Sequence, residues 1–416
     1  MHDRTAVIKR GPAPADAATR LALKRRYPTI ADLRKASRKN IPNFAYEYMD
    51  GGAGSDGNIA RNNASLDGIE MVPRYGVMIS PPPCEVTLFG RKYAAPFGIA
   101  PMGGPSVVFP GADVFMASAA QHARVPYTLG LVAGIDVERA AELAPDVLWF
   151  QLYRYAKNEH KIGFDLVRRA EIAGVHVLML TMDTPTRTTR PREVKSGILN
   201  PFKLDMRLRM DALSAPRWMM SMRKYGVPRF ASFAPYLPPN AGIEETAKFT
   251  ASEGGGAFSW DEVARYRDKW KKPLVLKGIM HPADAERAVS LGIDGILVSN
   301  HGGRQIEALP AAIDVLPAIA EQVKGRATIL FDSGVRSGWD VARAVALGAD
   351  VALAGKAFLW SMGAIGSRGP GHVIDTVTED LRATLGQLGA ADVAALRSVH
   401  TRHSTAYRLS DFQKQG

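Results

Sequence analysis

Eight short apolar runs, rich in valine, isoleucine and leucine, recur along the chain from residue 97 onward. They read FGIAP, VPYTLG, VLWFQLY, VHVLMLTMD, PLVLKG, GILVSN, ATILFDSG and DVALAG. Most are separated by segments such as GFDLVRRAEIAG and SGWDVARAVALG, in which apolar residues recur at the helical spacings of three and four. This alternation is typical of parallel β/α units, and no Rossmann glycine fingerprint accompanies it. The sequence therefore predicts an α/β fold, a (β/α)8 TIM barrel, in preference to an open doubly wound sheet.

Two parts of the chain lie outside this repeat. Residues 1–95 precede the first predicted strand and begin with a helix-like segment, and residues 194–256 form a long insertion after the fourth strand. Connections of that length are usually lids or binding elements. We therefore predict a basic N-terminal extension over residues 1–40, a barrel domain over 41–400 that includes the insertion as a lid or membrane-facing element, and a C-terminal tail over 401–416.

Positive charge is concentrated in two segments of the 416-residue chain, whose formal net charge is +12. Residues 1–40 carry 11 Lys and Arg against 3 Asp, and residues 194–230 carry 8 against 2, so the remainder is near −2. A nearly neutral body with two basic segments predicts contact with an anionic surface. The alternative is that both segments are simply solvated.

The composition also excludes several classes of protein. Cys84 is the only cysteine, which rules out an intrachain disulfide and a thiolate cluster for zinc or iron–sulfur. The chain has no run of about 18 apolar residues, and its first residues contain no apolar signal segment. We expect a cytoplasmic location, with peripheral contact at the inner face of a membrane through residues 194–230 as the alternative, and neither a metal site nor a nucleic-acid partner.

Polar or small residues end nearly every apolar run, and the carboxyl ends of barrel strands carry the active site in such folds. The run ends supply Pro101, Met102, Gly103, Gly130, Gln151, Tyr153, Thr181, Asp183, Lys277, Ser299, His301, Asp332 and Gly355. The last two loops, FDSGVRSG and ALAGKAF, add one cation each, Arg336 and Lys356. Glycine-rich backbone and a cation favour phosphate binding, unless these glycines serve only the turns.

Lys277 ends a buried run, where a lysine is unfavourable unless it faces an anion. The polar edge of a flavin ring would suit it, and Gln151 and Thr181 could hydrogen-bond the same edge. The alternative is a lysine that reaches the surface.

His301 has the side chain best suited to take a proton from a substrate hydroxyl near neutral pH, and Asp183 could orient it. Arg304 and Arg190 could each hold a carboxylate by two hydrogen bonds, with Tyr48 and Tyr153 as neutral donors. Simpler interpretations are a structural histidine, arginines of a basic loop and tyrosines that only pack.

Eight motifs in order, FAYEYMDGGAG, IAPMGG, WFQLYRY, LTMDTP, VLKGI, VSNHGGRQ, FDSGVRSG and AGKAFLW, resemble those of the FMN-dependent L-2-hydroxy acid oxidases and dehydrogenases. The resemblance runs from about Pro42 to RSVHTRHS. It implies a (β/α)8 barrel with bound FMN, His301 as base and Asp183 as its partner. It assigns the substrate to Tyr48, Tyr153, Arg190 and Arg304. It assigns FMN to Pro101, Met102, Gly103, Gly130, Gln151, Thr181, Lys277, Ser299, Asp332, Ser333, Gly334, Arg336, Gly355 and Lys356.

Three residues depart from the family pattern. Lys356 stands where arginine is usual, Gly130 where serine or threonine is frequent, and Val132 where an aromatic residue is common. Together with Gly103, the last two remove bulk, and we expect a pocket roomier than glycolate requires.

The resemblance implies oxidation of a small L-2-hydroxy acid to the 2-oxo acid, by hydride transfer to the flavin or by a carbanion route that uses the same residues. Gly103 and the basic insertion favour a dehydrogenase with a quinone or cytochrome acceptor. The alternatives are an oxidase that produces H2O2 from O2, or oxidation of a larger hydroxy-acid-like substrate. A homotetramer or larger assembly is expected. Rival interpretations are a non-redox flavin barrel and a non-enzymatic barrel that binds anionic surfaces.

Overall fold

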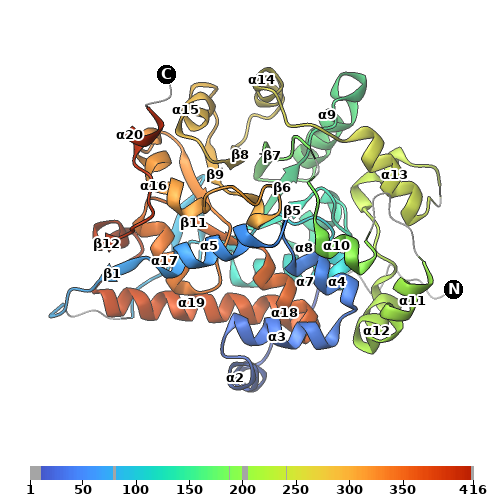
Figure 1. The fold of residues 1–416 in the computed structure, drawn as a ribbon, viewed down its shortest axis with the longest axis horizontal. Coiled ribbons are helices and arrows are strands. Elements are labelled where there is room, and N and C mark those ends of the chain that lie inside the picture. The colour runs from blue at the N-terminus through green and yellow to red at the C-terminus, as the bar shows by residue number, and fades with distance from the viewer. Residues whose placement is uncertain (1–10, 78–80, 187, 199–204, 240, 414–416) are drawn as a thin grey trace.

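The structure is a computed structural model that describes residues 11–77, 81–186, 188–198, 205–239 and 241–413. Eight parallel strands close into a barrel in the order β10-β11-β4-β5-β6-β7-β8-β9 (Figure 1). The strands are β4 (Phe97–Ile99), β5 (Tyr127–Gly130), β6 (Leu148–Leu152), β7 (Val177–Thr181), β8 (Leu274–Ile279), β9 (Gly295–Val298), β10 (Thr328–Phe331) and β11 (Val351–Ala354). Each lies within one of the eight apolar runs, and the predicted barrel is confirmed.

Almost every residue of the barrel strands is buried, since helices cover the outside and side chains fill the inside. Burial on both faces explains why the strands read as continuous apolar runs and do not alternate. The parallel register aligns their carboxyl ends: Gly130 pairs with Gln151 and Thr181 pairs with Lys277. The predicted site residues therefore share one end of the barrel.

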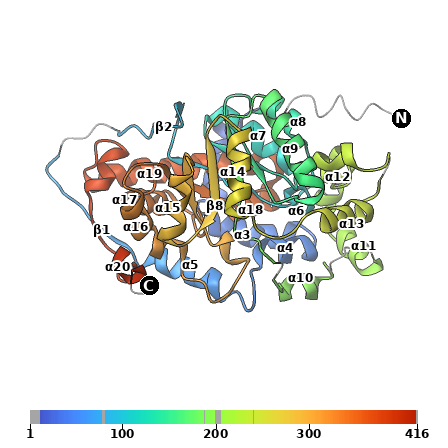
Figure 2. The same cartoon turned by 90° about the horizontal axis from the view of Figure 1, so that it is seen from above.

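Helices follow the strands around the barrel and cover it on the outside (Figures 1 and 2). They are α7 (Ala112–Ala123), α8 (Val137–Leu143), α9 (Lys157–Ile172), α14 (Trp260–Lys269), α15 (Pro282–Ser290), α16 (Ala312–Val323), α17 (Gly338–Ala346), α18 (Lys356–Ile365) and α19 (Gly369–Leu388). In α17, Ser337 caps the first turn by accepting from the Asp340 amide, and Val341, Ala344 and Val345 form the buried face. This spacing of one, three and four is the amphipathic pattern seen in the sequence.

The N-terminal region forms α2 (Ala17–Arg26), α3 (Ile30–Asn40), α4 (Asn43–Asp50) and α5 (Gly57–Asp67). Helix α3 begins with a capping box between Thr29 and Asp32 and packs Leu33 and Ser37 against α18. Lys24 forms an ion pair with Glu379 of α19.

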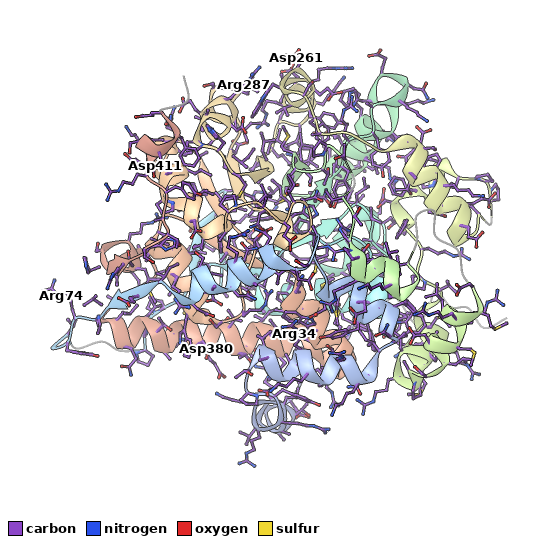
Figure 3. All side chains as sticks on the ribbon, in the orientation of Figure 1. Arg34, Arg74, Asp261, Arg287, Asp380 and Asp411 are labelled. Atoms are coloured by element: carbon purple, nitrogen blue, oxygen red, sulfur yellow. The ribbon has the colours of Figure 1, made fainter. Side chains whose placement is uncertain are left out.

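Some basic side chains of this N-terminal region form ion pairs within the fold. Arg34 (labelled in Figure 3) donates from Nε to Oδ1 of Asp50 at 2.7 Å, and Arg20 lies 3.7 Å from Asp375. These arginines belong to helices packed on the barrel, so the described part of the extension over residues 1–40 is not a freely solvated tail.

The insertion between β7 and β8 contains α10 (Pro191–Ser196), α11 (Met206–Leu213), α12 (Pro216–Tyr225), η1 (Ala231–Tyr236) and α13 (Ile243–Glu253). Short α6 (Pro105–Val108) follows β4, and the pairs β1 (Glu70–Val72) with β12 (His400–Arg402) and β2 (Val86–Leu88) with β3 (Arg91–Tyr93) complete the sheets. Across the described ranges, no helix is both long and apolar enough to cross a membrane.

Candidate active site

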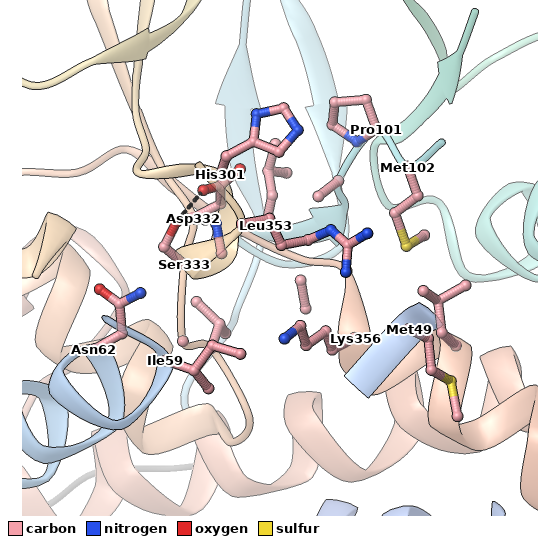
Figure 4. Close-up of a pocket in the computed structure, with 18 of the residues that line it drawn as sticks. Met49, Ile59, Asn62, Pro101, Met102, His301, Asp332, Ser333, Leu353 and Lys356 are labelled. Carbon is pink, nitrogen blue, oxygen red and sulfur yellow. Dashed lines mark hydrogen bonds between the residues drawn. The ribbon is translucent and has the colours of Figure 1, made fainter. Parts of the chain in front are cut away.

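A cavity opens at the carboxyl ends of the barrel strands, with an empty volume of about 970 Å³ that is partly open to solvent. The predicted site residues that line it are Tyr48, Pro101, Met102, Gly103, Tyr153, Arg190, Lys277, His301, Arg304, Asp332, Ser333, Gly334, Arg336, Gly355 and Lys356. In the close-up, His301 and Lys356 lie on opposite sides of the cavity (Figure 4).

His301 pairs with Asp183, which stands behind it relative to the cavity. Nδ1 of His301 lies 3.0 Å from Oδ1 and 3.1 Å from Oδ2 of Asp183, and it donates because an ionised carboxylate only accepts. Nε2 is then the nitrogen free to act as a base. Gly278 permits this approach: a Cβ there would lie 2.4 Å from Cγ of Asp183.

The backbone at His301 is held in the left-handed region, with φ of 61°. The hydroxyl of Ser333 (φ 83°) accepts from the amides of Asn300 and Gly302 at 3.2 and 3.0 Å. The side chains of Asn300 and Asn62 exchange two hydrogen bonds of 2.9 and 2.7 Å. Since non-glycine residues rarely adopt such angles, these bonds hold the loop that carries His301 in an unfavourable conformation.

Burial lowers the pKa of His301, and Lys277 lowers it further, while the carboxylate of Asp183 acts in the opposite direction. A base works when deprotonated, so we expect kcat/KM to fall with decreasing pH only below the ordinary histidine pKa of about 6.5. In Asp183→Asn the opposing effect is lost, so this acid limb should move to still lower pH while kcat falls. The measurement is the pH profile of kcat/KM for both proteins.

Asp136→Asn is the control for that pH profile, because Asp136 caps α8 and accepts from the Arg139 amide at 2.8 Å. Its profile should match that of the unaltered protein. An acid limb that moves to higher pH in Asp183→Asn would contradict the pairing.

Arg304 and Arg190 lie side by side around a carboxylate that the sequence analysis did not single out. Glu193, only 3 % exposed, accepts from Arg304 Nη2 at 2.6 Å and from Arg190 Nη1 at 3.3 Å. Arg304 also donates from Nη1 to the carbonyl oxygens of Tyr48 and Gly51, at 2.7 and 2.8 Å. Burial lowers the pKa of Arg304, and Arg190 adds to this. A second anion between the two arginines would therefore be stabilised.

Lys277 forms the floor of the cavity, and its side chain is buried. Its Nζ donates to Oγ of Ser299 at 2.9 Å and lies 3.8 and 3.7 Å from the carboxylates of Asp183 and Asp332. Although burial disfavours the charge, these two carboxylates raise the pKa of Lys277, which is therefore a cation.

Four other predicted residues, Gly130, Gln151, Thr181 and Ser299, do not line the cavity. Gln151 Nε2 donates to Thr181 Oγ1 at 2.8 Å in the layer beneath the cavity floor.

Lys356 and Arg336 make the far side of the cavity cationic. Lys356 Nζ donates to the carbonyl oxygens of Asp50 and Gly51 at 2.9 and 3.3 Å, and the Arg336 guanidinium stacks 4.7 Å above the Trp360 ring. Burial lowers the pKa of Arg336 to about 10, and burial together with Arg304 and Arg336 lowers that of Lys356. Within the described residues neither cation has a carboxylate in an ion pair, so this side of the cavity suits an anion.

The expectation that Gly130 enlarges the pocket is wrong. A Cβ at Gly130 would lie 2.4 Å from the carbonyl oxygen of Met102, so the backbone of Met102 fills the space that a side chain would take. Val132 does not line the cavity either. Gly103 does open into it, because a Cβ there would meet only the Tyr48 hydroxyl, at 3.7 Å.

Glu193, Asn62 and Asn300 are the residues around the site that sequence reasoning missed. Glu193 follows Arg190 by three residues at the start of a helix, a spacing at which the two side chains meet. That spacing could have predicted the ion pair between Arg190 and Glu193 from the sequence. The Asn62–Asn300 pair joins residues 238 positions apart and gave none.

A protein-family model described as FMN-dependent dehydrogenase matches residues 37–403. An L-lactate dehydrogenase of Pectobacterium atrosepticum is 35% identical over 379 residues, which span 91% of this chain and 97% of that protein. An L-lactate dehydrogenase of Caulobacter vibrioides is 35% identical over 369 residues, which span 88% of this chain and 96% of that protein.

Two solved structures extend the comparison to the fold. The monotopic membrane protein (S)-mandelate dehydrogenase superposes with a TM-score of 0.85 at 28% identity, covering 90% of this chain and 99% of the other. Mandelate oxidase superposes with a TM-score of 0.77 at 32% identity, covering 91% and 99%.

Proposed function

Because the chain belongs to the FMN-dependent dehydrogenase family, and is thus an FMN-dependent oxidoreductase of L-2-hydroxy acids, we propose that it is a dehydrogenase that delivers its electrons to a quinone or a cytochrome. The observation that supports oxidation of a hydroxy acid is the His301–Asp183 pair, at one cavity with Arg304, Arg190, Arg336 and Lys356. The cavity thus combines a base, two arginines that can bind a carboxylate, and a site for a second anion. The choice of a dehydrogenase rests on Gly103 and on the basic insertion.

The residues present fit FMN. Burial disfavours the positive charges of Lys356 and Arg336, and a bound phosphate would stabilise both; the charged Lys277 would face the polar edge of the ring. Ser333 and Gly334, both at positive φ, line the same cavity, and a loop of this kind can offer backbone N–H groups to a phosphate. When bound, FMN supplies a two-electron acceptor for the hydrogen on Cα of the substrate.

Each step assigned to the protein uses a group of the cavity. Arg304 and Arg190 would bind the carboxylate of the hydroxy acid, assisted by the hydroxyls of Tyr48 and Tyr153. Nε2 of His301 would take the hydroxyl proton, and Asp183 would stabilise the imidazolium that forms. Glu193 would offset the repulsion between the two arginines before substrate enters.

The substrate that we propose is larger than glycolate. Support comes from the open space at Gly103 and from relatives named for lactate and mandelate. L-lactate and (S)-mandelate are the two compounds to test first.

Peripheral contact with an anionic membrane is the second part of the proposal. Four apolar side chains on α11 and α12 are 66–68 % exposed: Met206, Met210, Leu213 and Met220. Basic residues of the same helices lie between them in the sequence or shortly after them, among them Arg207, Arg217 and Lys224. Apolar anchors among basic residues are typical of segments that lie in a membrane interface.

We expect the FMN-loaded protein to co-sediment with vesicles that contain anionic lipid, and less so at high salt. Replacing Met210 and Leu213 by glutamate should lower the partition coefficient about tenfold or more, because two apolar anchors are lost and two anions are added. Ile172→Glu is the control, since Ile172 is 73 % exposed but lies on α9. An equal loss of vesicle binding in Ile172→Glu, or no vesicle binding by the unaltered protein, would contradict the membrane contact.

The experiment that tests the proposed function follows the visible absorption of the purified holoprotein. Oxygen-free addition of L-lactate or (S)-mandelate should bleach the flavin band. Persistent bleaching after air is admitted supports a dehydrogenase, whereas rapid recolouring with H2O2 formation would identify an oxidase. If neither compound nor any other 2-hydroxy acid bleaches the flavin, the proposal fails.

A further inference from the structure

Helix α4, which carries Tyr48, receives its N-terminal cap from the insertion. The residue before the helix is Pro42, and no local side chain caps the first turn. Instead Asp211 of α11 accepts from the amides of Asn43 and Phe44, with Oδ1 and Oδ2 at 2.9 and 2.8 Å. Both amides would otherwise be unsatisfied donors of the first helical turn.

Helix α12 makes a second contact, with α6, a short helix that packs against α4. Nε1 of Trp218 donates to the carbonyl oxygens of Val107 and Val108 at 3.3 and 3.1 Å. The Trp218 ring also meets the Phe44 ring edge to face at 5.9 Å, which joins α12 to α4. The buried side of the insertion thus contacts both α4 and α6, two helices that pack against each other.

The two helices that contact the insertion position residues that line the cavity. The Tyr48 hydroxyl donates to the carbonyl oxygen of Gly103 at 2.7 Å, and Gly104 begins α6. Carbonyl oxygens at Tyr48 and Gly51, the last turn of α4 and the residue after it, bind Arg304. A displacement of α4 would therefore move the tyrosine and the arginine together.

We propose that Asp211 and Trp218 are positioning residues for substrate binding: from the insertion, they fix α4 and α6 so that Tyr48 and Arg304 are set for the carboxylate. This inference rests on the proposed function. It gives the two helices two separate roles, since Leu208 and Trp218 are buried and Asp211 binds α4, while Met210 and Leu213 are exposed. The insertion is then part of the substrate site although none of its α11 or α12 residues lines the cavity.

The test is steady-state kinetics of the holoenzyme with L-lactate and (S)-mandelate. Asp211→Ala should raise KM about three- to tenfold, the effect of losing a helix cap, with kcat within about twofold of the unaltered enzyme. Asp211→Asn keeps one acceptor oxygen and should recover most of the loss. Trp218→Phe, which keeps the ring contact with Phe44 but removes the N–H, should raise KM by a smaller factor.

Asp16→Ala is the matched control. Asp16 caps α2 by accepting from the Thr19 amide at 2.7 Å, with the same chemistry away from the cavity. Its KM should be unchanged. A loss of flavin content or melting temperature in Asp211→Ala without a change in KM would mean a merely structural role and would overturn the inference alone. An unaltered enzyme that oxidises no hydroxy acid would overturn the proposed function as well.

Discussion

Replacing His301 with glutamine should lower kcat by about 10²- to 10⁴-fold, the usual contribution of a general base. Glutamine can still donate to Asp183, but it cannot take a proton from the substrate hydroxyl. Flavin content should stay at the level of the unaltered protein, because Lys356, which is assigned to the phosphate, lies across the cavity from His301 (Figure 4). The measurement is the rate of flavin bleaching in a single oxygen-free turnover.

His176→Gln is the control for this loss. His176 precedes β7 at the opposite end of the barrel, where its Nε2 lies 2.9 Å from the carbonyl oxygen of Phe89. Residues at that end of a barrel affect stability more than chemistry, so kcat should be unchanged. A His301→Gln enzyme that keeps more than about a tenth of kcat would contradict the assignment of the base.

Arg304→Lys should reduce kcat/KM by about 30- to 1,000-fold, which corresponds to ~2–4 kcal/mol for one partner of a buried charge pair. The charge is kept, but a lysine cannot bind Glu193, the carbonyls of Tyr48 and Gly51 and a substrate carboxylate at once. Most of the loss should appear in KM, because the carboxylate contact is present before and during the reaction.

Arg61→Lys makes the same substitution on a guanidinium that only binds backbone, donating to the carbonyl oxygens of Glu307 and Leu309 at 2.8 and 2.7 Å. It should leave KM within about twofold, as expected for a surface change. A similar KM in Arg304→Lys and Arg61→Lys would show that Arg304 does not hold the substrate.

The barrel could be predicted because a parallel strand covered on both faces must be apolar along its length. For the same reason the strand ends could be located, and with them Lys277, His301 and Asp332. Most of the predicted residues that line the cavity lie in or shortly after a strand, where local sequence fixes their position; Tyr48 on α4 and Arg190 are exceptions.

Contacts between distant segments could not be predicted in this way. Asp211 and Asn43 are 168 positions apart, and no local sequence pattern at either residue predicts their contact. The effect of Gly130 was wrongly predicted because a glycine opens space only if no neighbouring group fills it. Here the carbonyl of Met102 does so. The basic N-terminal segment was taken as an appendage because charge counts do not reveal that Arg34 has a partner at Asp50.

The closure of the barrel bears on when the enzyme acquires its cofactor during synthesis. Strand β4 pairs with β11, where Ile99 meets Ala354, and Lys356 binds the carbonyl of Asp50. At a ribosomal rate of ~5–20 residues per second, β4 would wait roughly 13–50 s for its last neighbour. The two cations assigned to the phosphate, Arg336 and Lys356, leave the ribosome only at the end of that interval. Until Lys356 has been made, a nascent chain therefore lacks part of the proposed FMN site, and flavin uptake must follow synthesis of the last barrel strand.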